Sequence, residues 1–284
     1  MGSDEIHRLG GHVQARLPRP GHDSPVPETH RPMHTCPAAF AQAPLGRQHH
    51  PANQRLTRHC HDSAFATVVL EGGYLEAGDE GRRTVGPGDV LVHHAYESHL
   101  DSFSKRGAQV LILPIASRFA APLFGRVTDP DALVHIARHS PRDAWFALTA
   151  DMQACEQQHM DWPDLLAEQL RHDPGLSLQQ WAESYGLRPE TVSRGFQLAY
   201  GSSPKAFRAA VRARAAFKCI RESRQPLVDI AATLGYADQA HMSRAVKALT
   251  GHMPRTWRAD EDAGTTPCRS HASTGFKTAP QAAL

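Results

Sequence analysis

The stretch LVDIAATLGYADQAHMSRAVKALTGHMPRTWR, residues 227–258, decides the fold of the last third of the chain because it repeats an earlier stretch. Residues 178–208 carry the same turn glycines and the same Ser-Arg pair, with one residue fewer. An internal repeat defines the unit of structure, so it is interpreted first. The matching positions are Ala182 and Ala231, Gly186 and Gly235, Ser193-Arg194 and Ser243-Arg244, Phe196 and Val246, Gly201 and Gly251, Pro204 and Pro254, and Phe207-Arg208 and Trp257-Arg258.

Each copy predicts two helices joined by a tight turn. Apolar residues recur at helical spacing over 178–185, and Gly186 then supplies the left-handed conformation that ends a helix. A second helix follows from Pro189, and a longer helix over about 204–222 joins the two copies. The second helix of each copy leaves a polar face free for a DNA major groove. The predicted DNA-contacting residues are Arg188, Glu190, Thr191, Ser193 and Arg194, and in the second copy Asp238, Gln239, His241, Arg244 and Lys247.

The second copy also carries a long signature, which is IAATLGY at 230–236 followed by Gln239, His241, Ser243-Arg244, Lys247, Gly251, Pro254 and Trp257-Arg258. With this signature, residues 174–258 resemble the double helix-turn-helix DNA-binding domain of the AraC/XylS family of bacterial transcription regulators. Met242 and Val246 depart from the family pattern, which has aromatic residues there. The resemblance implies sequence-specific binding to double-stranded promoter DNA, control by a small-molecule effector, a homodimer and contact with RNA polymerase.

Charge supports nucleic-acid binding independently of the family. Residues 174–258 contain thirteen Lys or Arg against five Asp or Glu, a balance of +8. The whole chain is only +2, so the remainder carries −6. Such polarisation is typical of a basic nucleic-acid module joined to a different kind of domain. The alternative is that the arginines, Arg194 and Arg244 included, only pair with nearby carboxylates on a solvated surface.

Residues 52–115 differ from the repeat, because β-branched runs such as 66–70 and 110–113 are divided by Gly/Pro turns. This pattern predicts an antiparallel sandwich or barrel. The order His59-Cys60-His61, Gly73, Gly81, Pro87-Gly88-Asp89 and His99 resembles the cupin-like sensor domain that precedes the DNA-binding part of many AraC-type regulators. We therefore expect an α+β multidomain protein with an N-terminal cupin-like antiparallel β-barrel and a C-terminal all-α double helix-turn-helix domain.

The histidines of this segment are candidate metal ligands or pocket-lining residues. His59 and His61 share one face of a strand, and the resemblance places His99 where a further ligand is usual, so the three imidazoles could hold Zn²⁺, Fe²⁺ or Ni²⁺. The glutamate of the metal-binding cupin pattern is missing, which favours histidines that line a pocket without metal. His93-His94 offers a replacement ligand. The predicted effector pocket consists of His59, His61, Val68, Leu70, Tyr74, Val92 and His99.

An enzyme is the competing function, because a cupin with three histidines could be a metal-dependent dioxygenase or isomerase with an accessory DNA-binding domain. The missing glutamate, and the lack of another acid, base or nucleophile set at recognisable spacing, lead us to expect no enzyme activity. An architectural DNA binder without effector would leave the barrel unexplained.

The remaining segments complete the predicted organisation. Five scattered cysteines and the lack of a long apolar run or a signal peptide predict a cytoplasmic protein without disulfides and without a membrane segment. Helices are expected over 131–138, 141–157 and 163–171, and they either mediate dimerisation or pack on the barrel. The predicted division is a disordered segment 1–51, a barrel 52–115, a helical linker 116–173, a DNA-binding domain 174–259 and a disordered tail 260–284.

Overall fold

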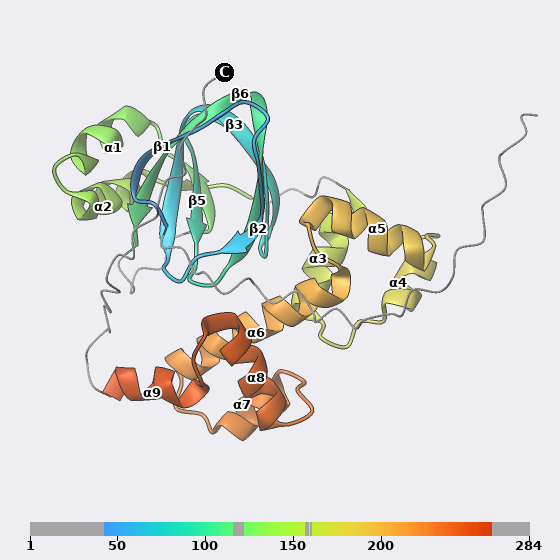
Figure 1. The fold of residues 1–284 in the computed structure, drawn as a ribbon. Coiled ribbons are helices and arrows are strands. Elements are labelled where there is room, and N and C mark those ends of the chain that lie inside the picture. Colours follow the sequence, from blue (N-terminus) through green and yellow to red (C-terminus); the bar gives the residue numbers. More distant parts are fainter. Residues whose placement is uncertain (1–42, 116–121, 157–158, 160, 263–284) are drawn as a thin grey trace, which may run out of the picture. The chain divides into compact units, whose positions relative to one another are not determined.

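The computed structural model describes residues 43–115, 122–156, 159 and 161–262. Strands β1 to β7 precede the helices, and the short strand β8 follows α2 (Figure 1), so strands and helices are largely segregated along the described residues, which confirms the predicted α+β class. The strands are β1 Gly46–His50, β2 Arg55–Cys60, β3 Phe65–Gly78, β4 Gly81–Val85, β5 Asp89–His93, β6 Ser98–Pro114, β7 Phe124–Arg126 and β8 Gln153–Ala154. The helices are α1 Pro130–Ala137, α2 Pro141–Asp151, α3 Trp162–His172, α4 Leu178–Ser184, α5 Pro189–Tyr200, α6 Pro204–Glu222, α7 Leu227–Thr233, α8 Gln239–Thr250 and α9 Pro254–Asp262.

The strands form one antiparallel sheet in the order β1-β6-β3-β5-β7-β8, with β2 paired to β6 and β4 to β3. The two long strands β3 and β6 pair from Phe65 opposite Pro114 to Gly78 opposite His99. Register shifts interrupt this pairing twice within 69–74. Because such irregularities bend and twist a strand, the sheet curves into the barrel-like form seen in Figure 1.

Successive residues of β3 alternate between two apolar clusters, as the pleat of a strand requires. Val68 packs in one cluster with Trp145 and Leu148 of α2, so this face of the sheet is covered by helices. Phe65 and Val69 pack in the other cluster, on the opposite face. The helices α1 and α2 therefore pack on the sheet, which was one of the two alternatives for them.

Three strands of the sheet lie in segments that the sequence predicted to be disordered or helical. Strand β1 lies within 1–51, predicted to be disordered, because Gly46–His50 pairs with β6. Strands β7 and β8 lie within 116–173, predicted to be helical. Helix α2 ends at Asp151 instead of 157, since Met152 is extended and leads into β8. These assignments depend on pairing between distant segments, which helical periodicity does not record.

At the other end, α9 continues to Asp262 and so enters the predicted tail 260–284. The predictions of disorder for 1–42 and 263–284 lie outside the described residues. The described cysteines are Cys60, Cys155 and Cys219, and all three are free thiols. In the part of the chain that the structure describes, no helix is long and apolar enough to cross a membrane.

Candidate functional site

The two helix pairs, α4 with α5 and α7 with α8, share the same turn geometry. Gly186 and Gly235 have φ values of +64° and +69°, which side chains rarely adopt. After the first turn, the Leu187 amide donates to the Ala182 carbonyl at 2.8 Å, and the equivalent bond of the second pair measures 2.9 Å. Such bonds satisfy carbonyls at the end of a helix, so each pair is a helix-turn-helix unit.

Both units pack on α6, which links them. In the first unit Phe196 and Phe207 are fully buried. In the second unit, Met242 and Val246 are also fully buried, against Ile220 of α6 among others. These two residues depart from the AraC/XylS pattern, and the structure shows that they still fill the core.

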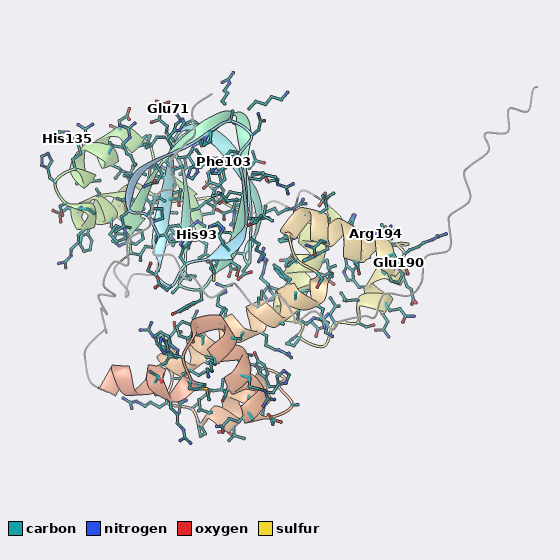
Figure 2. All side chains as sticks on the ribbon, in the orientation of Figure 1. Glu71, His93, Phe103, His135, Glu190 and Arg194 are labelled. Atoms are coloured by element: carbon teal, nitrogen blue, oxygen red, sulfur yellow. The ribbon has the colours of Figure 1, made fainter. Side chains whose placement is uncertain are left out.

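The ten residues predicted to contact DNA are all exposed. Figure 2 shows Glu190 and Arg194 projecting from α5. No ion pair joins Arg194 or Arg244 to a carboxylate within the described ranges. The alternative that both arginines only form surface ion pairs is therefore not supported. Asp238 has a structural role as well, since its carboxylate accepts a hydrogen bond from the His241 amide and caps α8.

Several basic residues of this region are engaged inside the protein. Arg208 donates to the carbonyls of Pro174 and Leu176, and Arg212 donates to that of Gly235. Arg214 is largely buried among carboxylates of the β3–β4 hairpin and the β5–β6 loop. The net charge of +8 therefore overstates the number of cations that face solvent.

Comparison with known proteins agrees with this geometry. Residues 181–260 match a protein family described as a helix-turn-helix domain. The chain carries an AraC-type helix-turn-helix domain. The match begins within α4 and ends within α9, so it includes most of the first unit, all of the second unit and the helix that links them. The AraC-type domain confirms the resemblance that the repeat indicated.

Solved structures similar to the chain include ToxT from Vibrio cholerae strain SCE256 with a bound unsaturated fatty acid, at 9% identity and a TM-score of 0.36 over 75% of this chain and 93% of that one. The C-terminal domain of AraT from Geobacillus stearothermophilus has 21% identity and a TM-score of 0.33, over 39% and 93%. An AraC-type regulator from Chromobacterium violaceum has 20% identity and a TM-score of 0.32, over 34% and 87%. A search of curated proteins found no match. The assignment of the AraC-type domain rests on the family match and the repeat.

A second candidate site lies in the sheet, where three histidines meet. His59 of β2 and His99 of β6 are cross-strand partners, and His61 follows the end of β2. One ligand atom from each of the three lies within 4.8 Å of the others. His93 of β5 adds a fourth imidazole, with its ring centroid 4.7 Å from that of His99. The structure thus brings together the three histidines that the sequence singled out.

Buried carboxyl groups line the same cluster. Glu76 Oε2 is 3.5 Å from His93 Nε2, and Asp101 Oδ2 is 3.9 Å from His99 Nε2. Burial raises the pKa of Asp101 to about 7 and lowers that of His93 to about 3, and it also lowers the pKa of His99 well below its usual value. Burial, with the Asp101 and Glu97 carboxyls nearby, also raises the pKa of Glu76 well above its usual value.

Glu76 and Asp101 were not among the residues predicted from the sequence. The spacing His99-x-Asp101 was a usable signal, because residues two apart on a strand share a face. Glu76 gave no comparable signal, since its place beside His93 depends on the way β3 and β5 curve around the site.

The predicted effector pocket is partly wrong. Val68 and Val92 lie in the cluster that α1 and α2 cover, and Leu70 packs against the same cluster. Tyr74 packs in the opposite cluster, with Phe65, and Phe65 contacts the rings of His61 and His93. The seven predicted pocket residues therefore do not all lie on one face of the sheet, and one cavity cannot be lined by all of them.

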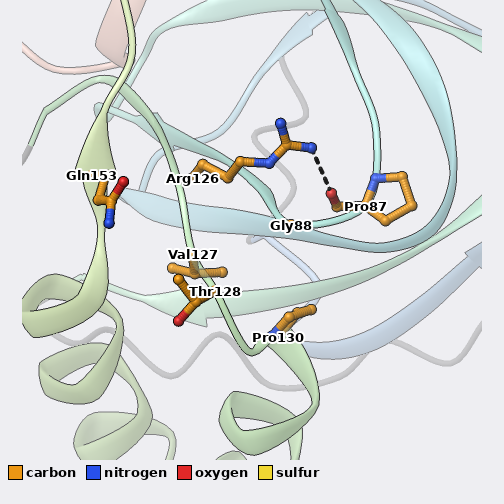
Figure 3. A pocket seen from close by; sticks show the side chains of 7 residues that line it. All are labelled: Pro87, Gly88, Arg126, Val127, Thr128, Pro130 and Gln153. Atoms are coloured by element: carbon orange, nitrogen blue, oxygen red, sulfur yellow. Dashed lines mark hydrogen bonds between the residues drawn. The ribbon is translucent and has the colours of Figure 1, made fainter.

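Two open pockets lie elsewhere on the sheet. One, of about 440 Å³, is lined by residues of the β4–β5 turn, β7 and the segment before α1, and there Arg126 donates to the Pro87 carbonyl at 3.1 Å (Figure 3). The other, of about 450 Å³, includes Tyr74 and Arg106. Neither is lined by a residue of the histidine cluster. We assign no ligand to either pocket.

Proposed function

We propose that this chain is a transcription regulator whose AraC-type domain binds promoter DNA under the control of a small effector held by the N-terminal sheet. The observation that carries the proposal is the pair of helix-turn-helix units on one helix, each with an exposed polar second helix. Neighbouring major-groove faces on one side of a duplex are about 34 Å apart, so two units on one helix suit two adjacent grooves, with DNA bending where needed.

Control would operate as a population shift. An effector that binds one arrangement of the sheet and the AraC-type domain more tightly increases the fraction of the chain in that arrangement. If only that arrangement presents both units to DNA, effector concentration sets promoter occupancy. A homodimer, a contact with RNA polymerase and a cytoplasmic site of action belong to the same proposal. No reaction is assigned to the sheet.

The exposed arginines test the proposed use of the two units. Arg194→Ala and Arg244→Ala should each weaken specific DNA binding by about 1–3 kcal/mol, because a guanidinium that contacts a guanine edge loses two hydrogen bonds. Fluorescence anisotropy would measure the affinity of each variant for a duplex selected from a random pool. Each change should relax base preference in a different half of the selected site.

Arg106→Ala is the matched control for these variants, because it removes one exposed arginine from strand β6 of the sheet and should leave affinity unchanged. If both reading-helix variants bind the selected and a scrambled duplex as the unchanged protein does, the proposed function is wrong.

Salt dependence gives an independent prediction for the full chain. Binding to any duplex should weaken steeply with salt, with a log–log slope of about −5 if about six phosphates are neutralised. Arg208 and Arg212 should contribute little to this slope, because their guanidinium groups are held by backbone carbonyls. A titration of affinity against KCl concentration measures the slope. A flat response would show that the basic face does not contact phosphates.

A further inference from the structure

The histidine cluster has the features of a metal site and not only of a packed core. His59 Nδ1 lies 2.8 Å from the Thr57 carbonyl, so the ring donates there and keeps Nε2 free as a ligand. A hydrogen bond from the second ring nitrogen to a carbonyl is the usual way that a protein orients a metal-binding imidazole. His59 is therefore already held in the tautomer that a metal ion needs.

Unsatisfied buried atoms point the same way. His99 is only 4% exposed, and its Nδ1 has no hydrogen-bond partner. His93 Nδ1 and Asp101 Oδ1, beside it, also lack partners. Buried polar atoms without partners are costly, and one established reason for them is an ion that completes the site.

The spacing suits a small divalent cation. Zinc binds histidine nitrogens at about 2.0 Å, which puts tetrahedral ligand atoms about 3.3 Å apart. The three ligand atoms here lie within 4.8 Å of one another, so small movements of the imidazoles would close the site. Asp101 and His93 stand close enough to support or supplement these ligands.

Strand β2 connects this site to the first helix-turn-helix unit. Arg58 precedes His59 and donates to the Tyr200 carbonyl, at the last residue of α5, at 3.0 Å. It also donates to the Ala77 carbonyl and pairs with Asp79. The register of β2 against β6 shifts just before His59, and irregular strands of this kind re-aim their side chains.

We propose that His59, His61 and His99 bind one divalent transition-metal ion, and that this ion is the effector, acting on the first helix-turn-helix unit through Arg58. This inference rests on the proposed function and names the ligand of its sheet. Closure of the ligands around the ion moves the end of β2, and Arg58 carries that movement to the carbonyl end of the reading helix α5.

The first test measures metal binding by the full chain after treatment with EDTA. Co²⁺ is the probe, because four-coordinate cobalt with histidine ligands absorbs visible light, and Zn²⁺ then displaces it. We expect about one tight Co²⁺ site per chain. His59→Gln with His61→Gln should weaken that site at least about tenfold.

The matched control is His49→Gln with His135→Gln, which removes two exposed histidines outside the cluster and should keep the tight site. Circular dichroism confirms that both double variants are folded. Equal loss of cobalt from both double variants, or no tight site in the unchanged protein, overturns the proposed metal site. DNA binding measured on the same samples would still decide the proposed function separately.

The second test measures control of DNA binding. Zn²⁺ should change the affinity of the chain for its selected duplex by about 5-fold to 150-fold, the usual range of coupling between two sites. Arg58→Lys keeps the positive charge but cannot reach Ala77, Asp79 and Tyr200 together, so it should bind Co²⁺ normally and lose most of the zinc effect. Tight metal binding without any change in DNA affinity overturns the role of the ion as effector, as does a full zinc effect in Arg58→Lys.

Discussion

Arg214→Met is expected to lower the free energy of unfolding by about 3–5 kcal/mol at about pH 8, because it removes the cation beside the buried Glu97 carboxylate and one of the two cations beside the buried Asp79 carboxylate. Arg214 of α6 lies beside Glu80, with its Nε 3.6 Å from Asp79 Oδ2 and its Nη1 3.7 Å from Glu97 Oε2. Burial opposes the charge of Arg214, but these three carboxylates together raise its pKa. Methionine retains much of the side-chain volume, so the effect measures the lost charge.

The loss should shrink as the pH falls. Burial already raises the pKa of Glu97 to about 7, and removal of Arg214 should raise it further. A carboxyl whose pKa is raised in the folded state stabilises the fold below its unfolded pKa, and that stabilisation is lost as the pH rises. The unfolded pKa is the same in both proteins, so the part of the loss that comes from Glu97 should shrink as the pH falls to about 7, where this carboxyl becomes protonated in the unchanged protein as well.

Urea unfolding followed by circular dichroism would measure both effects. Lys218→Met removes an exposed charge from the same helix and should change stability by no more than about 0.5 kcal/mol. An Arg214→Met variant that matches Lys218→Met at about pH 8 would contradict the prediction.

Phe207→Ala should lower the free energy of unfolding by about 3–5 kcal/mol, because it opens a cavity in the core of the first helix-turn-helix unit. The Phe207 ring is fully buried, with its centroid 5.3 Å from that of Phe196 and 5.2 Å from that of Tyr200. The Arg58 guanidinium stands 5.5 Å from the same ring, so the cavity also removes a contact with β2.

The second unit has its own core on α6, so it should remain folded in the Phe207→Ala variant. Footprinting of the selected duplex should therefore show protection reduced mainly at the half read by the first unit. Leu198→Ala is the control, since Leu198 is 76% exposed on α5 and contributes little burial. Equal stability of the two variants would show that Phe207 is not part of a cooperative core.

The sequence alone predicted the two helix-turn-helix units closely because their signals are local. Helical spacing and a turn glycine act within a few residues, and α5 begins at Pro189 as expected. The repeat supplied a second, matching copy of each pattern. Met242 and Val246 could therefore be placed in a core although they depart from the family pattern. The exposed face of each second helix followed from the same periodicity.

The sheet was harder to predict, because alternation shows that a strand has two faces but not what covers each of them. Only the register of β3 against β5 and β6 decided that Val68 and Val92 pack under α2 while Phe65 contacts the histidines. The two faces are equally apolar along β3, so no pattern within the strand separates them.

By itself, the sequence determined the class of the protein, the double helix-turn-helix unit and the three histidines, because each depends on residue type and short spacing. Only the tertiary structure decided that Glu76 and Asp101 are buried beside those histidines and that Arg214 lies largely buried among carboxylates. The physical reason is the same in both cases. Burial and the pairing of charges depend on segments far apart in the chain, and their energies arise only once folding has excluded water from between them.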